Sequence, residues 1–266
     1  MPAIQIDGRE LSYTDTGGNG TPVLLVHAFP MHAGMWDPQI QALGDRFRFI
    51  TPDLMGFGAS TAPEDRAAYS VDGYADDLAA LLDELGIDDV TLVGLSMGGY
   101  IAFAFLRKYR SKVSALVLAD TRAEADDEAG KAKRSGQQDM VAEGGTAGLI
   151  DALVGALLGG STRDEKADVV DKVRKVMDNP AAGFIGALEA LKNRPDSSGE
   201  LAQIDVPTLV IVGEDDAVTT PEMARRIHDN VAGSKLVEIP RVGHLSNLED
   251  AEAFNAALEE FLSSLR

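Results

Sequence analysis

One stretch of the chain, residues 90–109, constrains both the fold and the chemistry. It begins with the apolar, β-branched run Val90-Thr91-Leu92-Val93, passes through Gly94-Leu95-Ser96-Met97-Gly98-Gly99, and continues as an apolar segment too long for a strand. This order predicts a strand, a sharp turn and a helix. Glycines two residues before and two residues after Ser96 permit backbone contacts that a β-carbon would block. Ser96 is therefore predicted to be an exposed nucleophile on a strained turn.

Strands and helices alternate through most of the chain. A tight Asp7-Gly8 turn within residues 3–16 predicts an opening hairpin. Continuous apolar runs are typical of strands covered on both faces of a parallel sheet, and they occur at 23–26, 113–119 and 208–212, with shorter strands predicted at 47–53 and 235–239. Helical spacing predicts helices at 37–43, 71–85, 221–231 and 250–265. The alternation predicts an α/β fold with a mostly parallel central sheet flanked by helices.

Residues 121–198 interrupt this alternation. They contain no strand-like run, and three amphipathic stripes predict helices around 149–158, 169–177 and 184–191. We interpret residues 121–198 as an inserted helical lid, or cap, and residues 1–120 with 199–266 as the core domain. The apolar stripes are expected to pack mainly on each other and partly over Ser96.

A serine hydroxyl needs a base within hydrogen-bonding reach, and the base needs a carboxylate that fixes its tautomer. Among the four histidines, His244 follows the last strand, at the sheet edge where ligands bind in such folds, whereas His228 lies inside a predicted helix. His244 is the predicted base. Asp216, in the loop after the preceding strand, is the favoured acid, and Asp120, at the end of an earlier strand, is the competing one.

Two backbone amides are predicted to form the oxyanion hole. Met97 follows the nucleophile at a helix N-terminus, where its amide has no partner within the helix, and Phe29 follows the first core strand. Residues near these loops are candidates for the substrate pocket, because such sites are mostly hydrophobic. They are Ala28, Met31, Trp36 and Leu245.

Composition excludes several other functions. A net charge of -19 argues against a nucleic-acid partner, which needs a basic face. The absence of cysteine excludes disulfides, thiol nucleophiles and cysteine-based metal sites, and we expect no metal or cofactor. The N-terminal residues do not resemble a signal peptide, and no apolar run reaches roughly 18 residues. We therefore expect a cytoplasmic protein without a membrane partner. The sequence does not decide between a monomer and a homo-oligomer.

These motifs together resemble the α/β-hydrolase superfamily over nearly the whole chain. The resemblance rests on His27-Ala28-Phe29-Pro30, Asp53-Leu54 with Gly56, Gly58 and Ser60, the turn at Ser96, Gly213 to Asp216, and Gly243-His244. It implies the α/β-hydrolase fold, and it implies that Asp216, three positions after Gly213, completes a catalytic triad. The segment His244 to Glu249 is similar to that of 3-oxoadipate enol-lactonases and related esterases. Two departures are Ala28, where glycine is common, and Met55-Gly56-Phe57-Gly58, where Arg-Gly-His-Gly is common.

The sequence thus predicts a serine hydrolase that cleaves small carboxylic esters or lactones through an acyl-enzyme. The missing arginine and the charge of -19 rank a neutral ester above a dicarboxylate-type lactone. An enol-lactonase is the first alternative, and the family also suggests perhydrolase activity, in which peroxide replaces water. A third alternative is a hydrolase-fold sensor or receptor that binds a small molecule without turning it over.

Overall fold

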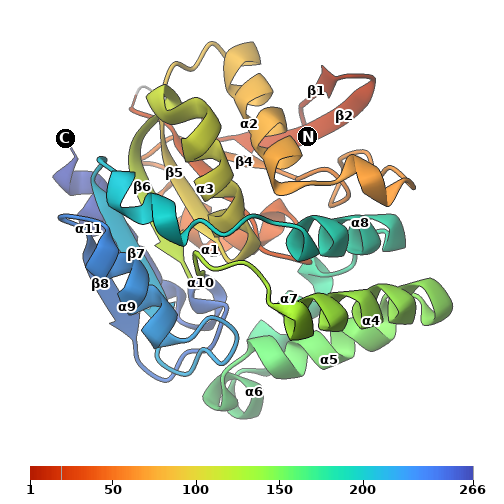
Figure 1. The fold of residues 1–266 in the computed structure, drawn as a ribbon. Coiled ribbons are helices and arrows are strands. Elements are labelled where there is room, and N and C mark those ends of the chain that lie inside the picture. Colours follow the sequence, from red (N-terminus) through yellow and green to blue (C-terminus); the bar gives the residue numbers. More distant parts are fainter. Residues whose placement is uncertain (19, 266) are drawn as a thin grey trace.

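The structure, a computed structural model, describes residues 1–18 and 20–265. Eight strands form one sheet in the order β1-β2-β4-β3-β5-β6-β7-β8 (Figure 1). The first two strands pair antiparallel with their neighbours, and all later pairs are parallel. The strands are β1 (Ala3–Ile6), β2 (Arg9–Asp15), β3 (Val23–Val26), β4 (Phe49–Pro52), β5 (Val90–Leu95), β6 (Val113–Ala119), β7 (Thr208–Gly213) and β8 (Lys235–Ile239).

Each central strand contributes to two hydrophobic cores, one on each face of the sheet. In β3, Leu24 and Val26 face one core, whereas Val23 and Leu25 face the other. Successive side chains of a strand point to opposite faces, so both sets must be apolar when both faces are covered. This explains the continuous apolar runs in the sequence.

Helices cover both faces. The first core includes buried residues of α2 (Val71–Glu84), α3 (Met97–Tyr109) and α9 (Pro221–Asn230), and the second includes those of α1 (Asp37–Leu43) and α11 (Ala251–Ser264). Ser70 begins α2 by accepting a hydrogen bond from the amide of Gly73. A four-residue helix, α10 (Ser246–Glu249), follows His244, and short 3-10 helices are η1 (Ala33–Trp36), η2 (Arg66–Ala68), η3 (Arg110–Lys112) and η4 (Ser198–Gln203). The predicted flanked, mostly parallel sheet is present.

Five α-helices lie between β6 and β7 and gather on one side of the molecule (Figure 1). They are α4 (Glu128–Gly144), α5 (Ala147–Leu157), α6 (Gly160–Glu165), α7 (Ala167–Val176) and α8 (Ala181–Lys192). The three predicted stripes correspond to α5, α7 and α8. Helix α4 buries only Gln138 and Val141, so no apolar stripe indicated it. The division into a core domain and a cap stays a prediction.

Candidate active site

Ser96 occupies a strained turn between β5 and α3. Its backbone has φ 55 and ψ -109, a conformation that L-residues rarely adopt. The flanking glycines explain how the turn fits. A Cβ on Gly94 would lie 2.3 Å from the carbonyl oxygen of Gly98, and a Cβ on Gly98 would lie 2.2 Å from that of Val26. The close approach of α3 to the ends of β3 and β5 thus requires glycine at both positions.

The turn places the hydroxyl of Ser96 beside His244. Ser96 Oγ lies 2.8 Å from His244 Nε2, and His244 Nδ1 lies 2.8 Å from Asp216 Oδ2. Asp216 and His244 are almost fully buried, and Ser96 keeps 9% of its surface exposed. The structure therefore brings together the serine, the histidine and the favoured acid in one chain of hydrogen bonds that reaches the surface only at Ser96.

The loop after β7 holds the carboxylate of Asp216 in place. The amides of Val218 and Thr219 donate to Oδ1, and the hydroxyl of Thr219 donates to Oδ2 at 2.7 Å. Burial alone would raise the pKa of Asp216, but the nearby His244 and these donors outweigh it, so that the pKa is lowered. For His244, burial acts to lower the pKa and the Asp216 carboxylate raises it, and the net result is a raised pKa. Sequence reasoning did not single out Thr219.

The competing acid makes different contacts. Asp120 Oδ1 accepts a hydrogen bond from the amide of Gly213, and Oδ2 accepts one from the amide of Ser246. Burial and the neighbouring charge of Asp216 raise the pKa of Asp120 to about 8. Asp120 thus connects the end of β6 to the end of β7 and to α10, whereas Asp216 contacts the imidazole.

The other histidines have partners away from Ser96. His27 is fully buried, its Nε2 accepts from the amide of Leu54, and burial lowers its pKa to about 4. His32 Nδ1 accepts from the amide of Gly34, within the loop that begins η1. The Nδ1 atom of His228 lies 2.8 Å from the hydroxyl of Ser234.

The two amides predicted for the oxyanion hole border the same cavity as Ser96. Phe29 and Met97 both line it, together with Ser96 and His244. Within residues 1–18 and 20–265, no group accepts a hydrogen bond from either amide. Two unpaired donors beside a nucleophile are suited to hold a developing negative charge.

The cavity has a volume of about 520 Å³, within the range of small-molecule sites. The four predicted pocket residues do not line it. Ala28, Met31, Trp36 and Leu245 are fully buried in the second hydrophobic core. Although these residues are close in sequence to the oxyanion loop and to His244, their side chains pack inward, which corrects the predicted pocket.

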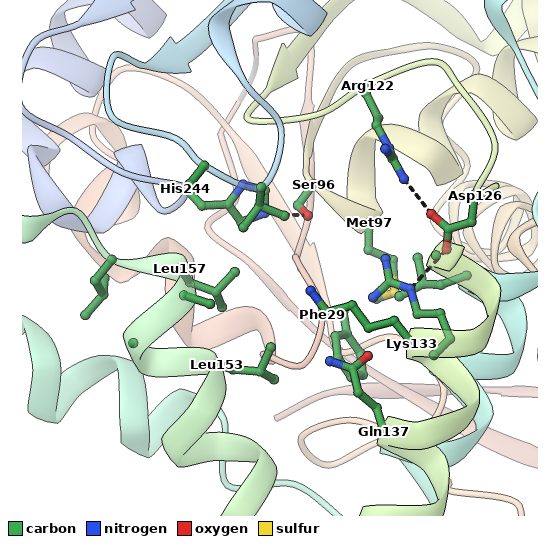
Figure 2. A pocket seen from close by; sticks show the side chains of 18 of the residues that line it. Phe29, Ser96, Met97, Arg122, Asp126, Lys133, Gln137, Leu153, Leu157 and His244 are labelled. Atoms are coloured by element: carbon green, nitrogen blue, oxygen red, sulfur yellow. Dashed lines mark hydrogen bonds and ion pairs between the residues drawn. The ribbon is translucent and has the colours of Figure 1, made fainter. Parts of the chain in front are cut away.

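Most of the cavity wall comes instead from residues 121–198. Apolar side chains there include Leu153, Leu157, Leu158 and Leu191, and Figure 2 shows Leu153 and Leu157 across from Ser96 and His244. Charged and polar side chains also contribute, and sequence reasoning missed them. They are Arg122, Asp126, Asp127, Lys133, Arg134, Gln137 and Arg163. The segment Lys131-Ala132-Lys133-Arg134 was the available signal, but nothing in the sequence indicates which face of α4 meets the cavity.

Two kinds of feature are absent from the described part of the chain. Among residues 1–18 and 20–265, no group of three or more His, Asp or Glu side chains could hold a metal ion. Over the same residues, no helix is both long enough and apolar enough to cross a membrane.

Comparison with known proteins identifies the family. A model of the alpha/beta hydrolase fold family matches residues 21–251. The chain belongs to the α/β-hydrolase fold family. This confirms the fold class and the resemblance noted in the sequence.

Named relatives of this α/β hydrolase include esterases and lactonases. The chain is 28% identical to 3-oxoadipate enol-lactonase 2 of Acinetobacter baylyi, over 94% of this chain and 91% of the relative. A malate-bound thermophilic esterase from Thermogutta terrifontis is 38% identical, with a TM-score of 0.93 over 99% of this chain and 97% of that one. The enol-lactonase from Burkholderia xenovorans LB400 is 28% identical, with a TM-score of 0.91 over 98% of this chain and 100% of that one.

Proposed function

We propose that this α/β hydrolase is a serine esterase that cleaves small carboxylic esters through an acyl-enzyme. The observation that carries the proposal is the unbroken chain of hydrogen bonds from Asp216 through His244 to Ser96, which ends in a cavity. Esterases among the similar structures support ester hydrolysis as the reaction.

In the first half-reaction, Ser96 Oγ attacks the ester carbonyl and His244 Nε2 accepts the hydroxyl proton. The Nδ1–H group of His244 keeps its proton and donates a hydrogen bond to Asp216 Oδ2. The carboxylate thereby stabilises the imidazolium. The amides of Phe29 and Met97 hold the oxyanion of the tetrahedral intermediate. When the intermediate collapses, the C–O bond breaks and the alcohol leaves with the proton from His244.

In the second half-reaction, water replaces the alcohol. His244 Nε2 accepts a proton from water, and the resulting hydroxide attacks the acyl carbonyl. The bond to Ser96 Oγ breaks, and His244 returns the proton to that oxygen. A carboxylic acid is released and the enzyme is restored, so no further reactant is required.

The test is turnover of p-nitrophenyl butyrate by the wild type and by Ser96→Ala. We expect steady turnover well beyond one equivalent of nitrophenol for the wild type, and a loss of kcat of about 10⁴-fold or more for the variant. The folded state of the variant is checked by its thermal unfolding. Activity retained by folded Ser96→Ala would refute the assignment of the nucleophile, and a burst without turnover would favour the sensor or receptor alternative.

Hydrolysis of an enol-lactone is a second candidate. The relatives from Acinetobacter baylyi and Burkholderia xenovorans carry that name, and the same atoms would open a cyclic ester. A panel of aryl esters, alkyl esters and lactones decides between the two through their kcat/KM values. If an enol-lactone exceeds every open ester by orders of magnitude, the lactonase assignment replaces the esterase one.

We also propose that residues 121–198 act as a cap that shapes the substrate pocket, because they supply most of the cavity wall. A cytoplasmic location stays a prediction, which cell fractionation can test.

A further inference from the structure

The loop between β7 and α9 gives the carboxylate of Asp216 a complete set of hydrogen-bond donors. Oδ1 accepts from the amides of Val218 and Thr219, at 2.7 and 2.9 Å. Oδ2 accepts from the hydroxyl of Thr219 at 2.7 Å and faces Nδ1 of His244 at 2.8 Å. An ionised carboxylate has about four lone-pair sites. Each oxygen of Asp216 therefore has two partners, and Thr219 provides one donor to each of them.

Thr219 also lies beside the imidazole of the base. Its Oγ1 atom is 3.1 Å from Nδ1 of His244, so Asp216 Oδ2, Thr219 Oγ1 and His244 Nδ1 form a closed triangle of contacts. All three residues are buried, with exposed fractions of 3% for Asp216, 1% for Thr219 and 2% for His244. Hydrogen bonds at such a depth are electrostatically stronger than they would be in water.

The chemistry of the three groups fixes where the hydrogens of this triangle lie. The carboxylate of Asp216 can only accept, because its pKa is lowered despite its burial and it is ionised at neutral pH. Nδ1 of His244 must therefore carry a hydrogen, which points at Oδ2. An N–H group cannot accept a hydrogen bond from Thr219. The threonine hydroxyl thus donates to Oδ2 and presents a lone pair to the Nδ1–H group.

These contacts restrict two rotations. The carboxylate of Asp216 can turn about its Cβ–Cγ bond only if both oxygens leave their donors, and Thr219 holds both oxygens at once. The imidazole of His244 can turn only if its Nδ1–H group leaves Oδ2 and the threonine oxygen together. With the hydrogen on Nδ1, the lone pair of Nε2 faces the hydroxyl of Ser96, 2.8 Å away.

We propose that Thr219 is a positioning residue, whose hydroxyl holds the Asp216 carboxylate and the His244 imidazole in the orientation that activates Ser96. This inference rests on the proposed function and adds a fourth side chain to its mechanism. Thr219 is not among the residues that line the cavity, so it acts through Asp216 and His244 and not on the substrate. Loss of its hydroxyl should therefore lower kcat and leave KM nearly unchanged.

Another buried threonine provides a matched control. Thr208, at the start of β7, is 2% exposed and donates its hydroxyl to the carbonyl of Val206 at 2.9 Å. Valine has nearly the shape of threonine, so its introduction at either position mainly removes one buried hydrogen bond. Thr208→Val thus reproduces the structural loss, and its hydroxyl contacts neither Asp216 nor His244.

The test measures steady-state turnover of p-nitrophenyl butyrate by the wild type, Thr219→Val, Thr219→Ser and Thr208→Val. We expect Thr219→Val to lower kcat about tenfold to a hundredfold, through the loss of a charge-assisted hydrogen bond, with KM within about twofold of the wild type. Thr219→Ser keeps the hydroxyl and should recover most of the loss. Thr208→Val should keep kcat within about twofold, and thermal unfolding compares the stabilities of the two valine variants.

A double-variant cycle separates action through Asp216 from a general disturbance. Changes that act through the same group are not additive, whereas independent changes multiply their effects on kcat. In the Asp216→Asn background, Thr219→Val should lower kcat by less than about a further twofold. The same factor in both backgrounds would mean that Thr219 acts independently of Asp216, which overturns the inference. Unchanged kcat in Thr219→Val, or equal losses in Thr219→Val and Thr208→Val, would overturn it as well.

Failure of the proposed function is visible separately. Diethyl p-nitrophenyl phosphate reacts with an activated serine and releases one equivalent of nitrophenol, so that no turnover of a carboxylic ester is needed. If the wild type does not turn over carboxylic esters, the proposed function fails, and the rate of this single reaction still compares the wild type with Thr219→Val. A slower reaction in Thr219→Val that Thr219→Ser restores supports the inference, and an unchanged rate contradicts it.

Discussion

Asp216 and Asp120 are both buried near His244, but their carboxylates have different hydrogen-bond partners. Asp216 contacts the imidazole directly, whereas Asp120 holds the amides of Gly213 and Ser246. Burial and the nearby charge of Asp216 raise the pKa of Asp120 to about 8, and the raised pKa makes Asp120 the weaker source of the negative charge that would stabilise an imidazolium. In the proposed mechanism, Asp216, whose pKa is lowered, provides that charge.

Replacing each acid by asparagine separates the two tasks. Asp216→Asn should lower kcat by about 10⁴-fold, because the amide favours the wrong tautomer of His244. Asp120→Asn should have a much smaller effect on kcat, but it should lower the free energy of unfolding by about 1–3 kcal/mol, because an amide NH2 replaces one of the accepting oxygens. Steady-state kinetics and thermal unfolding measure the two effects. The opposite order in kcat would make Asp120 the triad acid.

In the proposed mechanism, the raised pKa of His244 sets the acid limit of activity. His244 must be neutral to accept the proton of Ser96, so kcat/KM should fall as the pH drops through the pKa of His244. Because the Asp216 carboxylate raises that pKa above its usual 6.5, we expect the acid limb above pH 6.5 in the wild type. In Asp216→Asn the limb should move to lower pH, since the imidazolium loses its partner. A limb that does not move would mean that another group controls the profile.

At the residue scale, sequence reasoning found the groups that motifs locate and missed those that tertiary packing locates. Ser96 lies between glycines at fixed spacing, and His244 and Asp216 follow strands, so chain order was enough to group them. Lys133 lies on α4, which is formed by a charged segment of the sequence. Its position in the cavity depends on how α4 packs against the rest of the molecule. Ala28, Met31, Trp36 and Leu245 were misplaced because closeness in sequence does not show which way a side chain points.

Among the elements, the turn between β5 and α3 has no room for a β-carbon at its glycines. A Cβ on Gly98 would collide with the backbone of Val26, so Gly98→Ala must displace α3 or β3. We expect it to cost about 1–3 kcal/mol of stability and most of the activity. The matched control is Gly136→Ala in α4, where a Cβ meets nothing within 4 Å, and a gain of about 0.5–1 kcal/mol is expected. Stability is measured by thermal unfolding and activity by ester turnover for both variants. Similar effects of Gly98→Ala and Gly136→Ala would contradict the packing argument.

The strands and the helices of the core were predictable because burial enforces their patterns. The predicted strand at 208–212 is observed as Thr208–Gly213, and the predicted helix at 71–85 as Val71–Glu84. Helix α4 has too few buried apolar residues for a stripe, and α6 and α10 are too short to show a period. Their positions depend on long-range contacts.

At the scale of the whole molecule, the segment 121–198 and the loop of His244 are held together. The amide of His244 donates to the carbonyl of Leu157 at the end of α5. The buried carboxylate of Glu249 accepts hydrogen bonds from the amides of Gly159 and Leu245. The base of the proposed triad is therefore positioned partly by residues of the proposed cap.

Glu249→Gln tests this connection. The glutamine NH2 would face one of the two amide donors, so we expect the free energy of unfolding to fall by about 1–3 kcal/mol and kcat to fall with it, because Leu245 adjoins His244. Glu252→Gln, an exposed position on α11, is the control and should stay within about 0.5 kcal/mol of the wild type. If unfolding shifts and kcat does not, Glu249 supports the fold without positioning the histidine.

The hydrogen bond between His244 and Leu157 also restricts how parts of this chain can be exchanged with those of a relative. A chimaera joined at residues 121 and 198 would bring in a foreign α5 and α6, and with them a foreign carbonyl for the amide of the base. Its success would depend on whether the donor's backbone at 157–159 matches the recipient's loop from His244 to Glu249. In directed evolution, both segments should therefore be taken from the same parent protein, even though more than 80 positions separate them in the chain.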